Sequence, residues 1–210
     1  MSEISTSPEI FEKCTDTIIR QVNDIGRMVD EFSSFARMPK PVINCENLNE
    51  IIKSALFPQK VTFPDIEFGF EEPVEPVFAN CDGRLIVQAL SNLLKNASES
   101  IEGRLADHKN LEKGAIKIEL ECIQSMAFIH IVDNGLGLPA SDRARLAEPY
   151  ITTRAKGTGL GLAVVKKVAE EHDGSLVFSD DHSLGETGAR VTFSLPIVSE
   201  AIEVKNHAAE

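Results

Sequence analysis

The first forty residues carry apolar side chains with the spacing of a helix. From about Pro8 to Met38 these side chains recur in alternating steps of four and three, which predicts one long helix with a heptad-like seam. The seam consists of Phe11, Ile18, Val22, Ile25, Val29, Phe32 and Ala36, and it is widened by Ile19, Met28 and Phe35. A face this broad predicts packing against other helices, in a bundle or a dimer. The alternative is a helix that lies on its own domain.

The pattern changes after two prolines, Pro39 and Pro41, which are expected to end the helix and form a short stiff hinge. Strands are then expected near residues 42–45, 66–70, 77–79, 115–121, 127–133, 175–178 and 189–195. Helices are expected near residues 48–56, 82–101 and 160–172, the second of them with Asp82 as its N-cap. Residues 104–113 and 138–156 show no periodic element. This mixture predicts an α/β fold behind the long helix.

The composition is that of an acidic globular protein. Hydrophobic residues make up 42% and charged residues 26% of the chain, and the formal net charge is -12. Nucleic acid is therefore not an expected partner, because the basic residues are scattered. The four cysteines (Cys14, Cys45, Cys81 and Cys122) form no CxxC pair, so no zinc site is expected. Because neither a signal peptide nor a run of roughly 20 apolar residues is present, we expect no direct membrane contact by this chain.

The first group of candidate site residues lies on the predicted helix 82–101. Asn92, Asn96 and Glu99 share one helix face, whereas the leucines between them fall on the core side. Uncharged amide oxygens suit a magnesium ion that is held largely by phosphates and water. The alternative is a pair of solvent-exposed asparagines.

The second group follows the predicted strand 127–133. Asp133 ends an apolar stretch, and Gly135 and Gly137 come directly after it. Glycines there predict close approach of a ligand to the backbone, and a carboxylate can accept a hydrogen bond from an exocyclic amine such as that of adenine. The alternative is an Asn-Gly turn within a hairpin.

The third group is a glycine-rich run, residues 156–162, that leads into a helix. Glycines allow backbone N–H groups to surround a phosphate, and the helix N-terminus favours its negative charge. The run is not a dinucleotide-binding fingerprint, because an irregular stretch rather than a strand precedes it. It is not a Walker A loop either, because no Gly-Lys-[Ser/Thr] follows at the required spacing.

Together, and in this order, the three groups resemble the N, G1 and G2 boxes of the histidine-kinase ATP-binding domain. Residues 148–154 are similar to the F-box of that family, with Tyr150 where Phe is usual. The run Asn92–Ala97 and the Thr-Thr-Arg that precedes the glycines are most similar to the nitrogen-regulation sensor kinases of the NtrY type. Many members of the family carry a basic residue at the position of Glu99, which puts a phosphate role for Glu99 in doubt.

The resemblance implies an α/β two-layer sandwich, the Bergerat ATP-binding fold, in which a mixed sheet packs on helices. Residues 41–198 would form this domain, and residues 199–210 a frayed tail. Residues 1–40 are similar to the second helix of the dimerisation and phosphoacceptor bundle of the family. The bundle implies a homodimer.

The resemblance also assigns roles, with ATP and Mg²⁺ as cofactors. Asp133 would hold the adenine amine, with Gly135 and Gly137 as the floor of the nucleotide site. Asn96 would bind the magnesium ion, and Asn92 would lie toward the phosphates. Residues 138–156 would form a flexible ATP lid. The ATP contacts implied for the lid and the glycine run are Tyr150, Thr152, Thr153, Arg154, Lys156, Gly157, Thr158, Gly159, Leu160, Gly161 and Leu162.

One position favours phosphoryl transfer over hydrolysis. Hydrolases that share this fold resemble one another in a Glu four residues before the metal-binding Asn, and here that position is Asn92. An amide cannot act as a general base, so transfer to another nucleophile is expected. Two alternatives stay open: an ATP-binding module that is degenerate or biased toward phosphatase activity, and a serine-directed kinase or ATPase of the same fold.

The expected nucleophile, a helical histidine followed by an acidic residue and Asn-Pro, is absent from the sequence. His130 lies in an apolar strand, His172 ends a predicted helix, and the other three histidines fall in polar stretches. We therefore expect the chain to lack the first bundle helix and to be unable to phosphorylate itself. The resemblance implies a cognate response regulator as partner. It also implies a cytoplasmic location for this part of an inner-membrane sensor.

Overall fold

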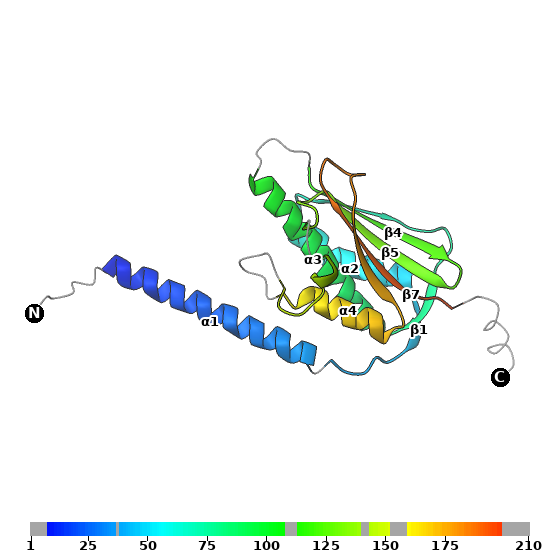
Figure 1. Ribbon diagram of the computed structural model, residues 1–210, viewed down its shortest axis with the longest axis horizontal. Helices are drawn as coiled ribbons and strands as arrows, with labels where there is room; N and C mark the ends of the chain where they lie inside the picture. Colours follow the sequence, from blue (N-terminus) through cyan, green and yellow to red (C-terminus); the bar gives the residue numbers. More distant parts are fainter. Residues whose placement is uncertain (1–7, 37, 108–112, 140–142, 152–158, 199–210) are drawn as a thin grey trace, which may run out of the picture.

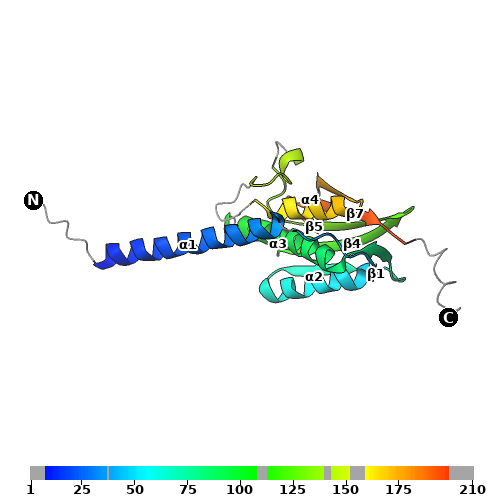
Figure 2. The same cartoon turned by 90° about the horizontal axis from the view of Figure 1, so that it is seen from below.

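The computed structural model describes residues 8–36, 38–107, 113–139, 143–151 and 159–198. Helix α1 (Pro8–Ala36) is a rod of 29 residues that stands apart from the sheet (Figure 1 and Figure 2). Its seam is solvent-exposed at Phe11, Ile18, Ile25 and Phe32. Among the described residues, α1 makes no extensive contact with another helix or strand. The apolar face predicted from the sequence is therefore present, and it is uncovered.

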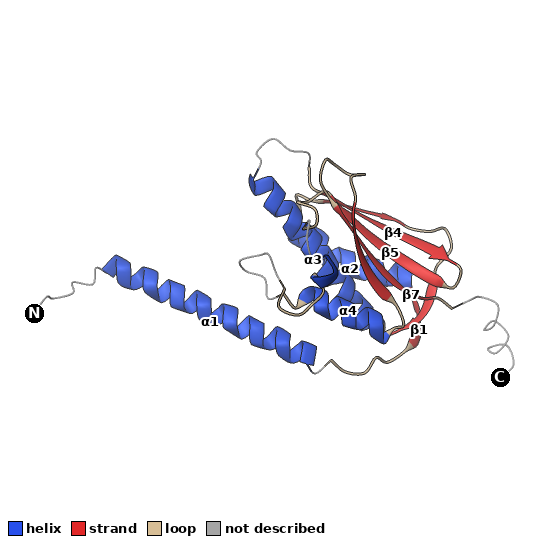
Figure 3. Cartoon of the chain, viewed as in Figure 1, coloured by secondary structure: helices blue, strands red, loops and turns tan. Residues whose placement is uncertain are grey.

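The strands that follow α1 in the described chain form one large and one small sheet (Figure 3). The five-stranded sheet has the order β2-β4-β5-β7-β6. Its strands are β2 (Glu67–Glu71), β4 (Ala115–Ile123), β5 (Met126–Asp133), β7 (Ala189–Pro196) and β6 (Ser175–Asp180). β2 runs parallel to β4, and the other neighbours are antiparallel, so the sheet is mixed. β1 (Asn44–Asn47) pairs antiparallel with β3 (Phe78–Cys81) in the small sheet.

Three helices cover one face of the five-stranded sheet. They are α2 (Leu48–Thr62), α3 (Gly83–Asp107) and α4 (Gly161–Glu171). The core lies between the two layers, where alternate residues of the central strands, such as Ile129 and Phe193, are fully buried. This arrangement confirms the predicted α/β two-layer sandwich. No helix of the described chain is both long enough and apolar enough to cross a bilayer.

Two helices continue beyond their predicted ends. α2 runs through Pro58 to Thr62, because the missing N–H of one proline removes only one backbone bond and Phe63 N–H closes the last turn on Gln59. α3 continues past Ile101 to Asp107, so residues 104–107 are helical rather than loop. The local pattern looked polar there, but Arg104 is buried and Leu105 packs against the core.

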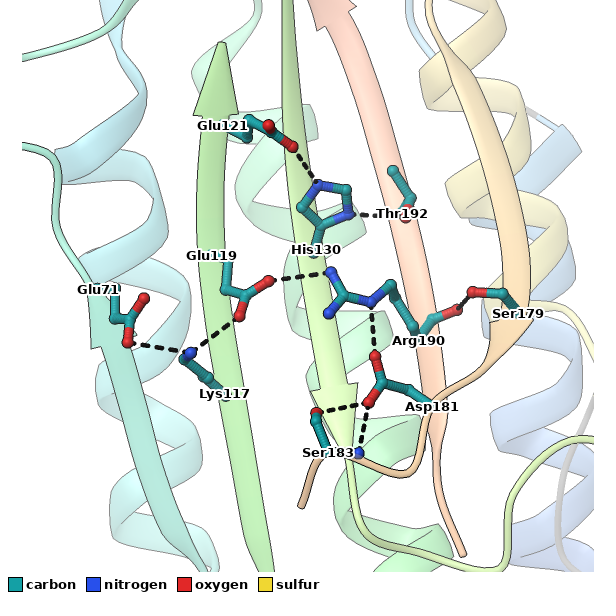
Figure 4. A network of polar contacts seen from close by, with 10 residues as sticks. All are labelled: Glu71, Lys117, Glu119, Glu121, His130, Ser179, Asp181, Ser183, Arg190 and Thr192. Carbon is teal, nitrogen blue, oxygen red and sulfur yellow. Dashed lines mark hydrogen bonds and ion pairs between the residues drawn. The ribbon is translucent and has the colours of Figure 1, made fainter. Parts of the chain in front are cut away.

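The opposite face of the sheet carries a chain of ion pairs (Figure 4). Lys117 Nζ lies 3.0 Å from Glu71 and 2.9 Å from Glu119. Arg190 continues the chain, with Nη1 at 2.9 Å from Glu119 and Nε at 2.7 Å from Asp181. These residues come from β2, β4, β7 and the loop after β6, so the network links β2 to β4 and, across β5, links β4 to β7. The sheet therefore packs through one face and presents a paired polar surface on the other.

Candidate functional site

Asp133 is the last residue of β5, the central strand of the sheet. It pairs with Ile116 of β4 on one side and with Ala189 of β7 on the other. The side chain is buried, and its Oδ1 accepts a hydrogen bond from the Gly135 N–H at 2.8 Å. The strand and its two neighbours therefore fix the carboxylate at the C-terminal end of β5, in the middle of the sheet.

Asn134 holds the chain that follows in place. Its side-chain oxygen accepts from the Ala115 N–H at 2.9 Å, and its amide donates to the Lys113 carbonyl at 2.9 Å and the Leu184 carbonyl at 3.4 Å. These bonds reach the start of β4 and the loop before β7. The alternative of a hairpin turn at Asn134-Gly135 is wrong, because the next strand along the chain is β6, and β6 is not a neighbour of β5 in the sheet.

The two glycines after Asp133 are required for different reasons, Gly135 by a close contact and Gly137 by its backbone conformation. A Cβ atom on Gly135 would lie 2.3 Å from the Ser100 Oγ, and Gly137 has φ +78. Ser100 Oγ accepts from the Leu136 N–H at 3.0 Å, and Thr187 Oγ1 donates to the Gly135 carbonyl at 2.7 Å. Ser100 and Thr187 were missed from the sequence. Ser100 could have been found, because it continues the four-residue spacing of Asn92 and Asn96.

The asparagine face of α3 lies beside this turn. Asn92 and Asn96 are partly buried, while Leu93 and Leu94 on the other side of the helix are in the core. Glu99 forms an ion pair with Lys95 at 3.9 Å, so it is a helix-surface residue in this structure. Among the described residues, no group of three His, Cys, Asp or Glu side chains is placed to hold a metal. The oxygens that the α3 face offers are those of amides, which are ligands acceptable to Mg²⁺.

Helix α4 begins with Gly161 and Leu162, the last residues of the glycine motif, and packs against α3. The Asp82 N–H, just before α3, donates to Nε2 of His172, just after α4, at 3.0 Å. Because this bond joins the start of α3 to the end of α4 and the two helices pack against each other, α4 runs back along α3. With 11 residues in α4 and about 1.5 Å of rise per residue, Gly161 lies roughly level with Leu93 and Leu94. By this estimate the N-terminus of α4 is expected at the level of the two asparagines, about one to two turns before Ser100.

A backbone hydrogen bond joins Tyr150, in the predicted lid, to Gly159, two residues before α4. The Tyr150 N–H donates to the Gly159 carbonyl at 3.1 Å, and both residues have positive φ, +66 and +71. A Cβ atom on Gly159 would lie 2.7 Å from the carbonyl carbon of Tyr150. Six predicted contact residues lie outside the described part of the chain: Thr152, Thr153, Arg154, Lys156, Gly157 and Thr158.

The described part of the predicted lid is fastened to the sheet. Arg143, in the short 3-10 helix Arg143–Arg145, donates from Nη2 to both carboxylate oxygens of Asp180 at 2.8 Å. Its Nε donates to the Pro139 carbonyl at 3.1 Å, and Ala147 is buried. The described residues of the stretch 138–156 therefore have defined anchors, and a flexible lid stays a prediction.

The family described as "Histidine kinase-, DNA gyrase B-, and HSP90-like ATPase" matches residues 81–199. The nitrogen regulation protein NtrY of Azorhizobium caulinodans is 51% identical over 177 residues, which are 84% of this chain and 23% of that protein. The chain thus spans less than a quarter of this relative.

Two solved structures share the fold. The mycobacterial sensor histidine kinase MprB has a TM-score of 0.64 and 26% identity, covering 74% of this chain and 98% of that one. The histidine kinase ThkA, solved in complex with the response regulator protein TrrA, has a TM-score of 0.68 and 26% identity, covering 91% of this chain and 53% of that one. The second match includes more of this chain than the first.

Proposed function

Because the chain belongs to the family of histidine kinase-, DNA gyrase B- and HSP90-like ATPases, we propose that it is the ATP-binding catalytic region of a two-component sensor histidine kinase. The family match confirms the predicted ATP-binding fold, and the similarity to NtrY confirms the predicted resemblance to nitrogen-regulation sensor kinases. The proposed reaction transfers the γ-phosphoryl group of ATP to a histidine nitrogen outside this chain. The phosphoryl group then passes to an aspartate of a response regulator.

The proposal is carried by the order of the three motifs along α3. From the length of α4 and its contact with the start of α3, its N-terminus would lie level with the asparagine face, while the turn after Asp133 contacts Ser100 farther along the same helix. A nucleotide that lies along α3 would have its base at Asp133 and its phosphates at the start of α4. This orientation of the nucleotide suits both of its ends. The helix N-terminus attracts the anionic phosphates, and the carboxylate accepts a hydrogen bond from the adenine amine.

The proposed roles follow from this placement. Asp133 accepts a hydrogen bond from the adenine amine, above Gly135 and Gly137. Asn96 offers its amide oxygen to Mg²⁺, with Asn92 toward the phosphates. The phosphate contacts proposed for the lid and glycine run are Tyr150, Thr152, Thr153, Arg154, Lys156, Gly157, Thr158, Gly159, Leu160, Gly161 and Leu162. Bound Mg²⁺ would supply charge neutralisation on the phosphate oxygens.

The chemistry left to the protein is positioning. Asn92 has no usable basicity, so it orients a phosphate or ligand rather than activating water. The incoming imidazole nitrogen forms a bond to the γ-phosphorus while the bond to the ADP oxygen breaks. Backbone N–H groups at the start of α4 stabilise the negative charge of the transferring group. This division of roles favours transfer to histidine over hydrolysis.

The wider assembly is proposed from the relatives and from α1. The complex of ThkA with TrrA supports a response regulator as partner. The exposed seam of α1 supports a homodimer through a helical bundle. The similarity to NtrY supports an inner-membrane sensor of which this chain is a cytoplasmic part.

The nucleotide assignment can be tested by changing Asp133 to Asn. We expect the affinity for ATP to fall by about 10- to 100-fold, because a buried hydrogen bond to a charged acceptor is lost. Inosine triphosphate, which has an oxygen in place of the amine, should bind the parent weakly and lose little in the variant. Titration calorimetry with both nucleotides measures the difference.

The control for this experiment is Asp173→Asn, a carboxylate-to-amide change at an exposed position. It should leave both affinities unchanged. Equal losses for ATP and inosine triphosphate in Asp133→Asn would show that Asp133 does not recognise the amine, and an unchanged ATP affinity would contradict the site itself.

A further inference from the structure

A second buried carboxylate, Asp82, lies where the linker after α1 meets the start of α3. It is 2% exposed. Its Oδ1 accepts from the Arg84 N–H at 3.1 Å, and the Ile86 N–H donates to its carbonyl at 3.1 Å. These bonds make Asp82 the N-cap of α3, as the sequence predicted. The start of the helix that carries Asn92 and Asn96 is therefore fixed by this residue.

The other carboxylate oxygen of Asp82 holds the linker. Val42 N–H donates to Asp82 Oδ2 at 2.9 Å across 40 residues of sequence. Four residues earlier, Met38 packs against the core. The segment between α1 and β1 is thus attached to the α/β layers at two points, and the Val42 bond is the polar one.

The backbone of Asp82 is tied to the second helix of the proposed nucleotide site. Its N–H donates to His172 Nε2 at 3.0 Å, while Nδ1 of the same ring lies 2.7 Å from the Val168 carbonyl. Nδ1 donates to this carbonyl, and Nε2 accepts from the Asp82 N–H. His172 is 5% exposed. One residue therefore contacts the linker, the start of α3 and the end of α4.

We propose that Asp82 is a positioning residue that locks the linker of α1 to the two helices of the nucleotide site. The consequence of this contact rests on the proposed function. If the helical segment carries the phosphate acceptor, a fixed linker determines where that acceptor meets the nucleotide. A carboxylate suits this role, because one oxygen caps α3 while the other remains directed at Val42. A serine or threonine cap is too short to do both.

Arg84 completes the arrangement without touching the linker. Its Nε and Nη2 donate to the Asp82 oxygens at 3.2 and 3.0 Å, and its side chain is 77% exposed. An exposed guanidinium contributes little to holding a backbone segment. Removing it leaves the bonds from the Val42 and Arg84 N–H groups in place, which makes Arg84→Ala a matched control.

The test uses Asp82→Ser in the whole chain. Serine keeps the N-cap of α3 and cannot reach Val42. We expect hydrogen exchange of the Val42 amide to accelerate by about tenfold or more, the change that loss of a bond worth about 1.4 kcal/mol would produce. The circular dichroism spectrum and the affinity for ATP should stay unchanged. Arg84→Ala should leave the exchange of Val42 as in the parent.

A distance measurement shows whether the bond places α1. Cys14 on α1 and Cys122 on β4 are exposed, and burial raises the pKa of Cys81 to about 12, which keeps that thiol unreactive. With Cys45→Ser as background, spin labels report the spread of distances between Cys14 and Cys122, in samples diluted with unlabelled chain. We expect a broader distribution for Asp82→Ser than for the parent or Arg84→Ala.

Several outcomes would overturn the proposal. They are unchanged Val42 exchange in Asp82→Ser, an unchanged distance distribution, or equal broadening in Arg84→Ala. If Asp82→Ser does not fold, Asp82→Asn serves instead, because one amide group cannot accept from both Val42 and Arg84, and the same readouts decide. Failure of the proposed function would be recognised by a different result, because the parent chain would then not bind ATP, whatever the distances show.

Discussion

At the scale of single residues, a buried carboxylate stays charged only where donors replace the water that it loses. Asp82 meets this condition with donors from its own helix and from the linker. Hydrogen bonds from the Arg84 side chain lower the pKa of Asp82 to about 2, although burial raises it, and the backbone N–H groups of Val42 and Leu85 add to the lowering. The charged form is therefore the one that the fold stabilises.

This shift predicts a dependence of stability on pH. The pKa of Asp82 is lower in the folded state than its ordinary value of 3.8. Its contribution of about 2 kcal/mol is therefore complete well above 3.8 and is lost as pH falls from about 5 through 2. Urea unfolding of the parent and Asp82→Asn should differ most near neutral pH and converge in acid. A difference that is the same at about pH 3 and pH 6 would contradict this account.

At the scale of elements, the periodic pattern predicted every helix and strand of the described fold except the short 3-10 helix. The ends were harder, because they depend on contacts that the local pattern does not contain. α3 continues to Asp107 because Arg104 is buried and Leu105 packs against the core in the folded chain. The hydrogen bond between the backbones of Tyr150 and Gly159 was not predictable either. Both residues have positive φ, and the only sign of this in the sequence is the glycine itself.

Two glycines of one motif predict opposite effects on stability. Gly159→Ala should lower the free energy of unfolding by about 1–3 kcal/mol, because the new methyl would meet the Tyr150 backbone at a positive φ. Gly161→Ala, which has open space at the start of α4, should be neutral or stabilising by up to about 1 kcal/mol. Denaturant unfolding without nucleotide compares them. Equal losses of unfolding free energy in the two variants would contradict the close contact between Gly159 and the Tyr150 backbone.

At the scale of the whole molecule, the sequence could not predict how distant segments meet. The roles of Asp133 and the glycines are local, and motif order was enough to propose them. The bonds from Asp82 to Val42 and to His172 span 40 and 90 residues, and no periodic signal joins those positions. The packing of α4 against α3, which sets where α4 begins relative to α3, is likewise a property of the assembled layers.

The exposed face of α1 predicts self-association of the chain. Ile18 and Ile25 are 62% and 58% exposed on the apolar seam. Sedimentation should show a concentration-dependent dimer or larger bundle, since burial of such a face is favourable. Ile18→Glu with Ile25→Glu should shift the equilibrium to monomer. Thr17→Glu with Asn23→Glu, the same charge outside the seam, should not. A monomer at all concentrations of the parent would exclude this role for α1.

The order of the strands also has a consequence for synthesis on the ribosome. β4 and β5 are separated only by Gln124 and Ser125, so this hairpin can form as soon as Asp133 has left the exit tunnel. The other neighbour of Asp133 is Ala189, in a strand that is translated more than fifty residues later. Until β7 emerges, β5 has an unpaired edge and the core lacks Phe193. The nascent chain should therefore be a client for chaperones during the interval in which α4 is made.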